Sequence, residues 1–258
     1  MNCDQRAIRF NCHGSSMVGI IDLPERPLPR GVLVVAGQPY SRLGAQRQFA
    51  MLARALARRG FAVMRFDRRG VGDSEGCDYN DSDVRSAVQE FCEQVPGVRE
   101  VVLLAPGSGA AIATATACAR YDPRVRALLL FDARRRSGRR MAHMLAPATP
   151  APSPIGAALF WRRSQAPRRG AAGARLAGLA DQLCAFPGRV LVVAGAGSDG
   201  AAPADGAQAE LAALRALLAG ATLGERVQIV EDAQHAAAMA AEADCARAAT
   251  CASWMVSW

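Results

Sequence analysis

The chain has 258 residues, of which 51% are hydrophobic and 5% aromatic, and its mean hydropathy is +0.05. This length suits one α/β domain, so we predict a single domain over residues 1–258. No apolar run reaches the roughly eighteen residues of a membrane-spanning helix. The charged start MNCDQRAIRF lacks the apolar stretch of a signal peptide, and we therefore expect a cytoplasmic protein.

The net charge of +8 is concentrated in one region, and all 31 basic residues are Arg. Ten of them lie between Arg134 and Arg175, in a stretch that contains no Asp or Glu. The rest of the chain has 21 Arg against 23 acidic residues, a net charge of −2. We predict a basic cap, or insertion, at about 134–180 that attracts an anionic ligand or a membrane surface. No specific nucleic acid partner is expected.

The eight cysteines contain no C-x-x-C pair. This spacing argues against a zinc site and against a redox dithiol. In a reducing compartment the cysteines are expected to be thiols. We expect no metal and no cofactor.

Strands and helices alternate along the chain after an opening hairpin. The hairpin strands are predicted at 7–12 and 17–22, joined by the turn-forming HGSS. Further strands are predicted at 31–37, 61–67, 101–105, 125–132, 189–195 and 226–231. Helices are predicted at 45–59, from Asp81 or Ser82 to 92, at 109–120, 173–184 and 207–219, and at the C-terminus. This alternation is typical of a parallel sheet covered on both faces.

Eight strands with one insertion after the sixth form the order of the α/β-hydrolase fold. We therefore predict a mainly parallel eight-stranded sheet with helices on both faces and the basic cap after strand 6. In that fold the nucleophile lies in G-x-S-x-G, on a tight turn after the fifth strand. The corresponding segment here is VVLLAPGSGAAIA.

Aligning this segment with the motif places Gly107 in the nucleophile position and Ser108 one residue later. Ala105 then occupies the first Gly position and Gly109 the second. Two hypotheses follow. Either the turn is shifted by one residue so that Ser108 acts as the nucleophile, or the serine chemistry is lost and the turn is only a scaffold.

The general base of the fold follows the last strand, where QIVEDAQH supplies His235. Two acids compete to orient this base. Asp199 follows the seventh strand, two residues later than the usual G-x-x-D spacing, and Asp132 ends the sixth strand. His13 and His143 have no partner in the sequence and are assigned to a solvated turn or to the insertion.

The loop after the third strand usually completes the oxyanion hole with backbone N–H groups. Here that loop contains AGQPYSRLGAQRQF, and Gly37 and Gln38 are the predicted donors. Gly109, at the start of the next helix after the elbow, is the third candidate donor. All three lie where parallel strands end.

The segment FDRRGVGDSEG, residues 66–76, matches a D-x-R-G-x-G-x-S loop after the fourth strand. Gly70 and Gly72 permit tight turns. Asp67 and Ser74 can bond nearby backbone groups. The loop is predicted to be structural.

Together with GQPYSRLGAQRQF, LARALARRGF, VPGVREVVL and the terminal DAQH, this loop resembles the hydrolase 1 family associated with the exosortase A system. That family consists of bacterial α/β-hydrolases encoded with exopolysaccharide and protein-sorting genes. The resemblance covers residues 5–132 well and 185–258 loosely. The family has Cys and then Asp at the elbow, where this chain has Gly107 and Ser108, and G-R-D after the seventh strand, where this chain has Ala196 and Gly197. Only His235 is carried over directly.

The sequence thus favours a hydrolase of an ester or thioester that acts on a small-molecule or lipid-linked substrate. The alternative is a catalytically impaired protein of the same fold that acts as a binding or accessory protein. A remote alternative is a nucleotide-binding protein, because GAGSDG at 195–200 is a literal G-x-G-x-x-G and Glu231 ends the next strand. Against it, AAPADG separates the motif from the next predicted helix.

Overall fold

The computed structural model describes residues 3–36, 40–44, 47–77, 80–106, 109–131, 183, 186–195, 216, 226–232 and 241–258. Its strands are β1 (Cys3–Cys12), β2 (Ser15–Pro24), β3 (Arg30–Val34), β4 (Ala62–Phe66), β5 (Glu100–Pro106), β6 (Val125–Phe131), β7 (Arg189–Gly195) and β8 (Val227–Asp232). Its helices are α1 (Gln48–Ala57), α2 (Asp81–Gln94), α3 (Gly109–Tyr121) and α7 (Ala241–Val256).

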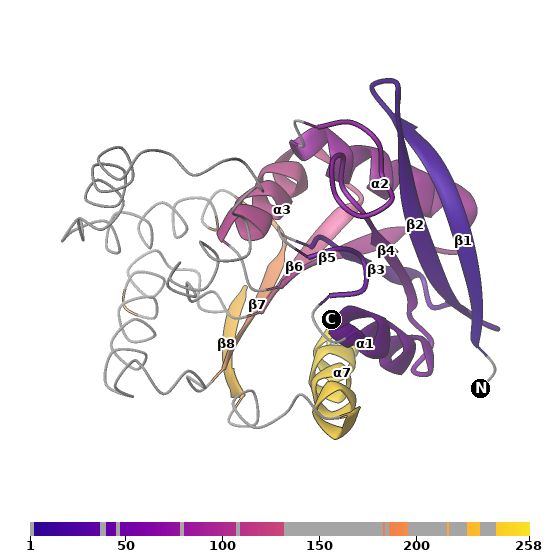
Figure 1. Cartoon of the computed structure of the whole chain (residues 1–258). Helices are drawn as coiled ribbons and strands as arrows, with labels where there is room; N and C mark the ends of the chain where they lie inside the picture. Colours follow the sequence, from indigo (N-terminus) through magenta and orange to yellow (C-terminus); the bar gives the residue numbers. More distant parts are fainter. Residues whose placement is uncertain are drawn as a thin grey trace, which may run out of the picture.

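All eight strands form one sheet in the order β1-β2-β4-β3-β5-β6-β7-β8 (Figure 1). β1 pairs antiparallel with β2, and β2 pairs antiparallel with β4. From β4 onward every pair is parallel. The prediction of a mainly parallel eight-stranded sheet of the α/β-hydrolase type is therefore confirmed.

Helices cover both faces of this sheet (Figure 1). α2 and α3 pack on one face, and α1 and α7 pack on the other. β5 shows why both faces need cover. Its Val101 and Leu103 join the core under α2 and α3, while Val102 and Leu104 join the core under α1 and α7. Such continuous apolar runs mark strands that are buried on both sides.

The β1–β2 hairpin is longer than its sequence pattern predicts. Its turn consists of His13 and Gly14, both with positive φ, as a two-residue hairpin turn of the primed type requires. Ser15 and Ser16, which were assigned to the turn, instead pair with Cys12 and Asn11 and extend the ladder. Small polar residues thus belong to the strand here, because the pairing continues up to the two turn residues.

The start of α2 also differs from the predicted cap at Asp81 or Ser82. The N-cap is Asn80, whose side chain accepts a hydrogen bond from the Ser82 N–H at 2.9 Å. Asp81 and Asp83 fall in the first turn, where a negative charge interacts favourably with the helix dipole.

The predicted cap at about 134–180 lies outside the described residues. The helices predicted at 173–184 and 207–219 lie almost wholly outside them as well. Leu183 and Ala216 are described there, and both are helical. The extent of the single domain and of the cap therefore stays a prediction. Within the described part of the chain, no helix is long and apolar enough to cross a membrane.

Aromatic and basic side chains attach the C-terminal end of α7 to the sheet. The Arg30 guanidinium lies 3.7 Å from the centre of the Trp258 ring, and that of Arg189 lies 5.4 Å from it. Arg30 also donates to the Met255 carbonyl and pairs with Glu100, Nε to Oε2, at 2.6 Å. Cation–π contacts of this kind are worth about 0.5–2 kcal/mol. They attach the helix at the amino ends of β3 and β7.

One close approach in the core gives a direct test of the packing. A Cβ atom on Gly31 of β3 would lie 2.6 Å from Cε1 of Phe91 and 2.9 Å from Cγ1 of Val98. Gly31→Ala should therefore lower the free energy of unfolding by about 1–3 kcal/mol, measured by urea titration. Phe91→Leu should restore part of this loss in the double variant.

Gly97→Ala is the matched control, because its nearest atom, Cγ of Pro27, would be 3.7 Å away. It should change the free energy of unfolding by less than about 0.5 kcal/mol. Equal losses in Gly31→Ala and Gly97→Ala would contradict the packing described for β3 and α2.

Candidate active site at the carboxyl ends of the strands

The parallel strands bring several loops to one edge of the sheet. Pro106 at the end of β5 lies beside Phe131 at the end of β6, which lies beside Val193 of β7. Val35, which follows β3, donates its N–H to the Leu104 carbonyl of β5 at 2.8 Å. The chain therefore leaves β3, β5, β6, β7 and β8 at a common edge. Ligands of open α/β sheets bind outside this edge.

Each candidate residue from the sequence follows one of these strand ends. Gly37 and Gln38 follow β3, Ser108 follows β5, Asp132 follows β6, Asp199 follows β7 and His235 follows β8. All six lie outside the described residues, as does Gly107, so the contacts among them stay predictions. Gly109 is described, and it is the first residue of α3.

The direction of the crossovers reverses between β3 and β5. β3 lies between β4 and β5, so the crossover from β3 to β4 runs in one direction across the sheet and the crossover from β4 to β5 returns in the other. Right-handed crossovers in opposite directions place their helices on opposite faces, as α1 and α2 are placed. Such a reversal of strand order is where ligand sites form in doubly wound sheets.

The turn between β5 and α3 is short. β5 ends at Pro106 and α3 begins at Gly109, so two residues, 107 and 108, connect a buried strand to a helix. A connection of this length is typical of a nucleophile elbow. The free N–H groups and the dipole at the helix N-terminus favour negative charge close to it.

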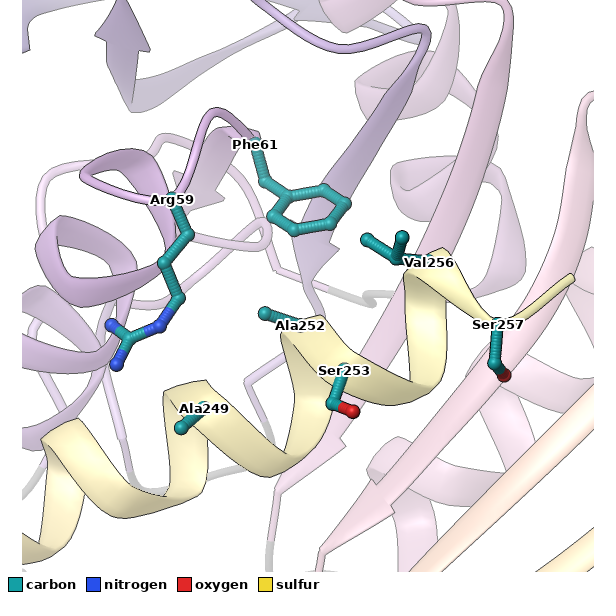
Figure 2. A pocket seen from close by; sticks show the side chains of 7 residues that line it. All are labelled: Arg59, Phe61, Ala249, Ala252, Ser253, Val256 and Ser257. Carbon is teal, nitrogen blue, oxygen red and sulfur yellow. The ribbon is translucent and has the colours of Figure 1, made fainter.

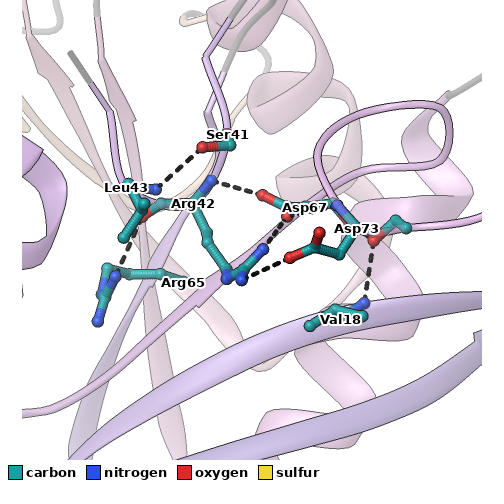
Figure 3. A network of polar contacts seen from close by, with 8 residues as sticks. Val18, Ser41, Arg42, Leu43, Arg65, Asp67 and Asp73 are labelled. Atoms are coloured by element: carbon teal, nitrogen blue, oxygen red, sulfur yellow. Dashed lines mark hydrogen bonds and ion pairs between the residues drawn. The ribbon is translucent and has the colours of Figure 1, made fainter.

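A buried carboxylate holds the segment after β3 against the end of β4 (Figure 3). Asp67, whose side chain is 0% exposed, accepts from the Arg42 backbone N–H at 2.5 Å and from Nη1 of the same residue. It also accepts from the Asp73 N–H at 3.2 Å. The Arg42 guanidinium reaches Asp73 as well, Nη2 to Oδ2, at 2.7 Å. One carboxylate thus joins two loops.

The other side of the Arg42 peptide is held too. Its carbonyl accepts from Nη1 of Arg65 on β4 at 3.2 Å (Figure 3). Arg65 pairs with Asp22 of β2, Nη2 to Oδ2, at 3.0 Å, and both side chains are almost fully buried. Gln5 of β1 donates to the same carboxylate at 2.5 Å. A continuous polar chain therefore runs from the edge strand to the loop after β3.

These charges keep Arg42 in its charged form. Burial alone would lower its pKa, but the hydrogen bond to Asp73 and the nearby charge of Asp67 outweigh burial and raise the pKa above its ordinary value. Its guanidinium is therefore bound to two carboxylates of the chain itself. Arg42 serves the structure of the loops and is poorly suited to binding an anionic substrate.

The D-x-R-G-x-G-x-S loop has a second buried carboxylate on its other side. Asp83 of α2 accepts from the Arg69 backbone N–H at 3.1 Å and from its Nε at 2.6 Å. Ser74 donates to the Asp67 carbonyl at 2.7 Å and accepts from the Val18 N–H at 2.9 Å. The predicted backbone bonds of Asp67 and Ser74 are thus present. Sequence reasoning missed Arg42, which lies 25 residues from its partner Asp67.

A hollow of about 460 Å³ lies elsewhere on the molecule (Figure 2). It is lined by Arg59, Phe61, Ala249, Ala252, Ser253, Val256 and Ser257. Phe61 directly precedes β4, so the hollow opens at the amino ends of the parallel strands. The candidate active site is at the opposite edge, and the hollow is no part of it.

The described thiols and acids offer no competing centre. Burial raises the pKa of Cys118 on α3 to about 12, so this thiol is uncharged and unreactive at neutral pH. The cysteines whose side chains the structure describes are free thiols: Cys3, Cys12, Cys77, Cys92, Cys118 and Cys251. Within the described ranges, no group of three His, Cys, Asp or Glu side chains is arranged to hold a metal ion.

Gly72 gives a test of the Asp67 site. Its φ is +57°, and a Cβ atom there would lie 2.2 Å from Oδ2 of Asp67. Gly14, in the hairpin turn, has a φ of +84° and no atom within 4 Å of the same position. Gly14→Ala should cost about 1–2 kcal/mol of unfolding free energy from backbone strain alone. Gly72→Ala should cost at least about 1 kcal/mol more, because it also displaces the buried carboxylate.

Urea unfolding of the two variants measures this difference. Equal losses in both would show that Asp67 moves aside freely and does not tie the two loops together.

Comparison with known families and structures agrees with this architecture. The model of the family described as serine aminopeptidase, S33 (Hydrolase_4) matches residues 44–175, slightly more than half of the chain. The match spans α1, β4, the Asp67 loop and the turn between β5 and α3. No curated protein sequence matches the chain.

Solved structures with the same fold cover nearly the whole chain. An esterase of Pyrococcus furiosus, Pf2001, is 11% identical, with 99% of this chain and 92% of that chain covered and a TM-score of 0.64. Est1E of Butyrivibrio proteoclasticus, solved with ferulic acid, is 14% identical over 97% and 98% of the chains, with a TM-score of 0.60. A thioesterase domain from the curacin biosynthetic pathway is 16% identical over 100% of both chains, with a TM-score of 0.56. These likenesses show the α/β-hydrolase fold.

Proposed function

Because the chain belongs to the Hydrolase_4 family, described as serine aminopeptidase, S33, we propose that it hydrolyses an ester or a thioester with Ser108 as the nucleophile. The single observation that carries this proposal is the two-residue connection between β5 and α3. Ser108 directly precedes the first residue of α3. It is therefore the side chain at the junction of strand and helix, where the nucleophile of this fold lies. The esterases and the thioesterase that share the fold favour an ester or thioester.

In the proposed reaction the Ser108 hydroxyl attacks the carbonyl carbon while His235 accepts the hydroxyl proton. His235 then gives this proton to the leaving alcohol or thiol, which departs as the acyl-enzyme forms. A water molecule attacks the acyl-enzyme in the second half, with His235 again as the base. The proton returns to Ser108 as the acid product leaves.

The negative charge that develops on the carbonyl oxygen of the substrate needs hydrogen-bond donors close to it. The backbone N–H groups of Gly37 and Gln38, after β3, and of Gly109, at the start of α3, are the proposed donors. β3 and β5 are neighbours in the sheet, so the two groups of donors flank one crevice.

Asp199 and Asp132 remain the two proposed acids for orienting His235. β7 lies between β6 and β8, so the strand before Asp199 is adjacent to the strand before His235. The strand before Asp132 is one further away, and neighbouring strands are about 4.8 Å apart. Asp199 starts closer but follows its strand end by four residues, whereas Asp132 follows directly. Asp199→Asn and Asp132→Asn would identify the acid by the larger loss of kcat.

A second candidate function is binding without turnover, and Gly107 is the observation that favours it. In the motif alignment this glycine takes the nucleophile position, and glycine has no side chain to attack a substrate. The protein would then keep the crevice of a hydrolase as a binding or accessory protein. The nucleotide-binding alternative rests on GAGSDG, which lies outside the described residues after its first glycine, and the family match gives it no support.

A fluorophosphonate probe distinguishes the first two functions. If Ser108 is the nucleophile, the probe should label the wild type, Ser108→Ala should abolish labelling and His235→Ala should reduce it strongly. Hydrolysis of p-nitrophenyl acetate should fall by about 10³-fold or more in Ser108→Ala. Ser253→Ala, which alters the hollow at the opposite edge, is the matched control and should label like the wild type.

Absence of labelling in the wild type would overturn the proposed nucleophile. Gain of labelling in Gly107→Ser would then support the second candidate, since it would restore a hydroxyl at the aligned position.

The resemblance to the exosortase A system-associated family extends this proposal to a lipid-linked substrate, with the Arg-rich segment at 134–180 as the contact for an anionic ligand or membrane surface. Ten Arg without an acidic residue support it. Binding to vesicles of anionic lipid should be strong at low salt and weaken steeply toward physiological salt, measured by co-sedimentation. Neutral vesicles are the control, and equal binding to both kinds would contradict the proposal.

A further inference from the structure

We propose that the edge of the sheet at the amino ends of the parallel strands, which we call the amino edge, binds the surface of a membrane that contains anionic lipids. The amino edge lies opposite the candidate active site and apart from the segment at 134–180, which follows the carboxyl end of β6. The inference is therefore independent of the proposed hydrolase activity. The described residues that lead into the parallel strands are 25–31, 58–63, 95–101, 122–126, 186–190 and 226–228.

Arginine recurs at the start of each of the six parallel strands. It is the first or second residue of β3, β6 and β7, and it precedes β4, β5 and β8 by no more than three residues. Neighbouring strands are about 4.8 Å apart, so six strands spread this row over about 24 Å. In the order of the sheet from β4 to β8, the row contains Arg59, Arg30, Arg99, Arg126, Arg189 and Arg226.

Hydrogen bonds between neighbouring backbones hold these positions side by side. Arg99 donates its N–H to the Pro29 carbonyl at 2.8 Å, which joins the start of β5 to the start of β3. At the other end of the row, the Arg226 carbonyl accepts from the Val190 N–H at 2.8 Å, which joins the start of β8 to β7. The row is thus built into the sheet, and its spacing follows from the pairing of the strands.

Positive charge is in excess at the amino edge. Its described residues include nine Arg against three acidic side chains. Two of the acids are bound within the edge. Glu100 pairs with Arg30 at 2.6 Å and lies 3.9 Å from Arg126, and Asp122 pairs with Arg124 at 2.8 Å. The excess attracts an anionic surface over about 10 Å at 0.1 M salt.

The dipoles of the helices do not account for this row. The helices end at the amino edge, where their last carbonyl groups favour a positive charge. However, α2 and α7 have no basic residue in their last turn. The arginines belong instead to the strands and to the connections before them, where Arg26, Arg58, Arg99 and Arg189 are exposed to solvent.

Exposed apolar side chains at the same edge favour a lipid surface over a polyanion as the partner. Val256 of α7 is 68% exposed and Leu28, before β3, is 37% exposed. Leu28 donates its N–H to the Gly60 carbonyl at 2.8 Å, and Val256 lines the hollow with Arg59 and Phe61 (Figure 2). Proteins that lie on membranes combine basic side chains with apolar ones that enter the boundary between headgroups and acyl chains.

Co-sedimentation of the full chain with vesicles of phosphatidylcholine and phosphatidylserine tests the proposal. One arginine near an anionic membrane strengthens binding about fivefold, so Arg99→Gln/Arg126→Gln should bind at least about tenfold more weakly at low salt. Arg6→Gln/Arg9→Gln is the matched control, because it removes the same charge from exposed positions on β1, outside the row. Its binding should stay within about twofold of the wild type. Both double variants should unfold at the same urea concentration as the wild type, because all four side chains are exposed.

Val256→Ser separates a lipid surface from a polyanion. It should weaken binding to the anionic vesicles by about threefold or more, because the side chain loses apolar contact with the membrane. It should leave binding to heparin, a polyanion without acyl chains, unchanged. Val230→Ser is the control, since Val230 is 36% exposed and lies on β8 away from the amino edge, and it should bind vesicles like the wild type.

Hydrolysis of p-nitrophenyl acetate should be the same in these variants as in the wild type, so membrane binding is measured separately from the proposed function. The inference is wrong if the wild type does not bind anionic vesicles at low salt. It is also wrong if the two double variants lose binding equally, which would assign the binding to another surface. If Val256→Ser binds vesicles like the wild type while Arg99→Gln/Arg126→Gln binds heparin more weakly, the amino edge is a site for a polyanion and the membrane role is wrong.

Discussion

A parallel sheet has to be covered on both faces, and in this protein that requirement decides where chemistry can occur. The strands from β4 onward are parallel, so each must be followed by a connection that returns to the opposite edge. The helices α1, α2 and α3 lie in such connections, and α7 follows the last strand. Together the four helices bury the apolar runs of the strands on both sides. The connections that leave the strands at the carboxyl edge lie where a sheet of this topology binds its ligands.

Rigidity at this edge comes from buried charge, in contrast to the apolar centre of the sheet. Asp22, Arg65, Asp67 and Asp83 are all buried near the end of β4 or in the strands beside it. Ion pairs in such places add little net stability relative to an apolar core, but breaking one of them is expensive. Their contribution here is to fix the relative orientation of the two loops. A carboxylate with three defined donors accepts one arrangement of the two loops, whereas apolar side chains would tolerate several.

The sequence predicted what depends on local pattern. The apolar runs of β3 to β8 follow from side-chain periodicity, and so does a parallel sheet that is covered on both faces. The hairpin turn was predicted over HGSS, and only the strand pairing limits it to His13 and Gly14. The bonds of Asp67 and Ser74 were also predictable, because their partners include backbone groups a few residues away. The Arg42–Asp67 pair was not, since it joins loops 25 residues apart whose approach is set by the pairing of β3 with β4.

The sequence motif and the helix boundary assign the nucleophile position between β5 and α3 to different residues. When the chain is aligned on the glycines of G-x-S-x-G, Gly107 takes the nucleophile position. When the position is taken from the start of α3, Ser108 is the residue directly before the helix. The position relative to the helix has the more direct physical meaning, because the N–H groups that stabilise an oxyanion are those of the helix N-terminus. For this reason the proposed nucleophile is Ser108, which directly precedes α3 in the sequence, even though the flanking glycines are shifted by one residue relative to the motif.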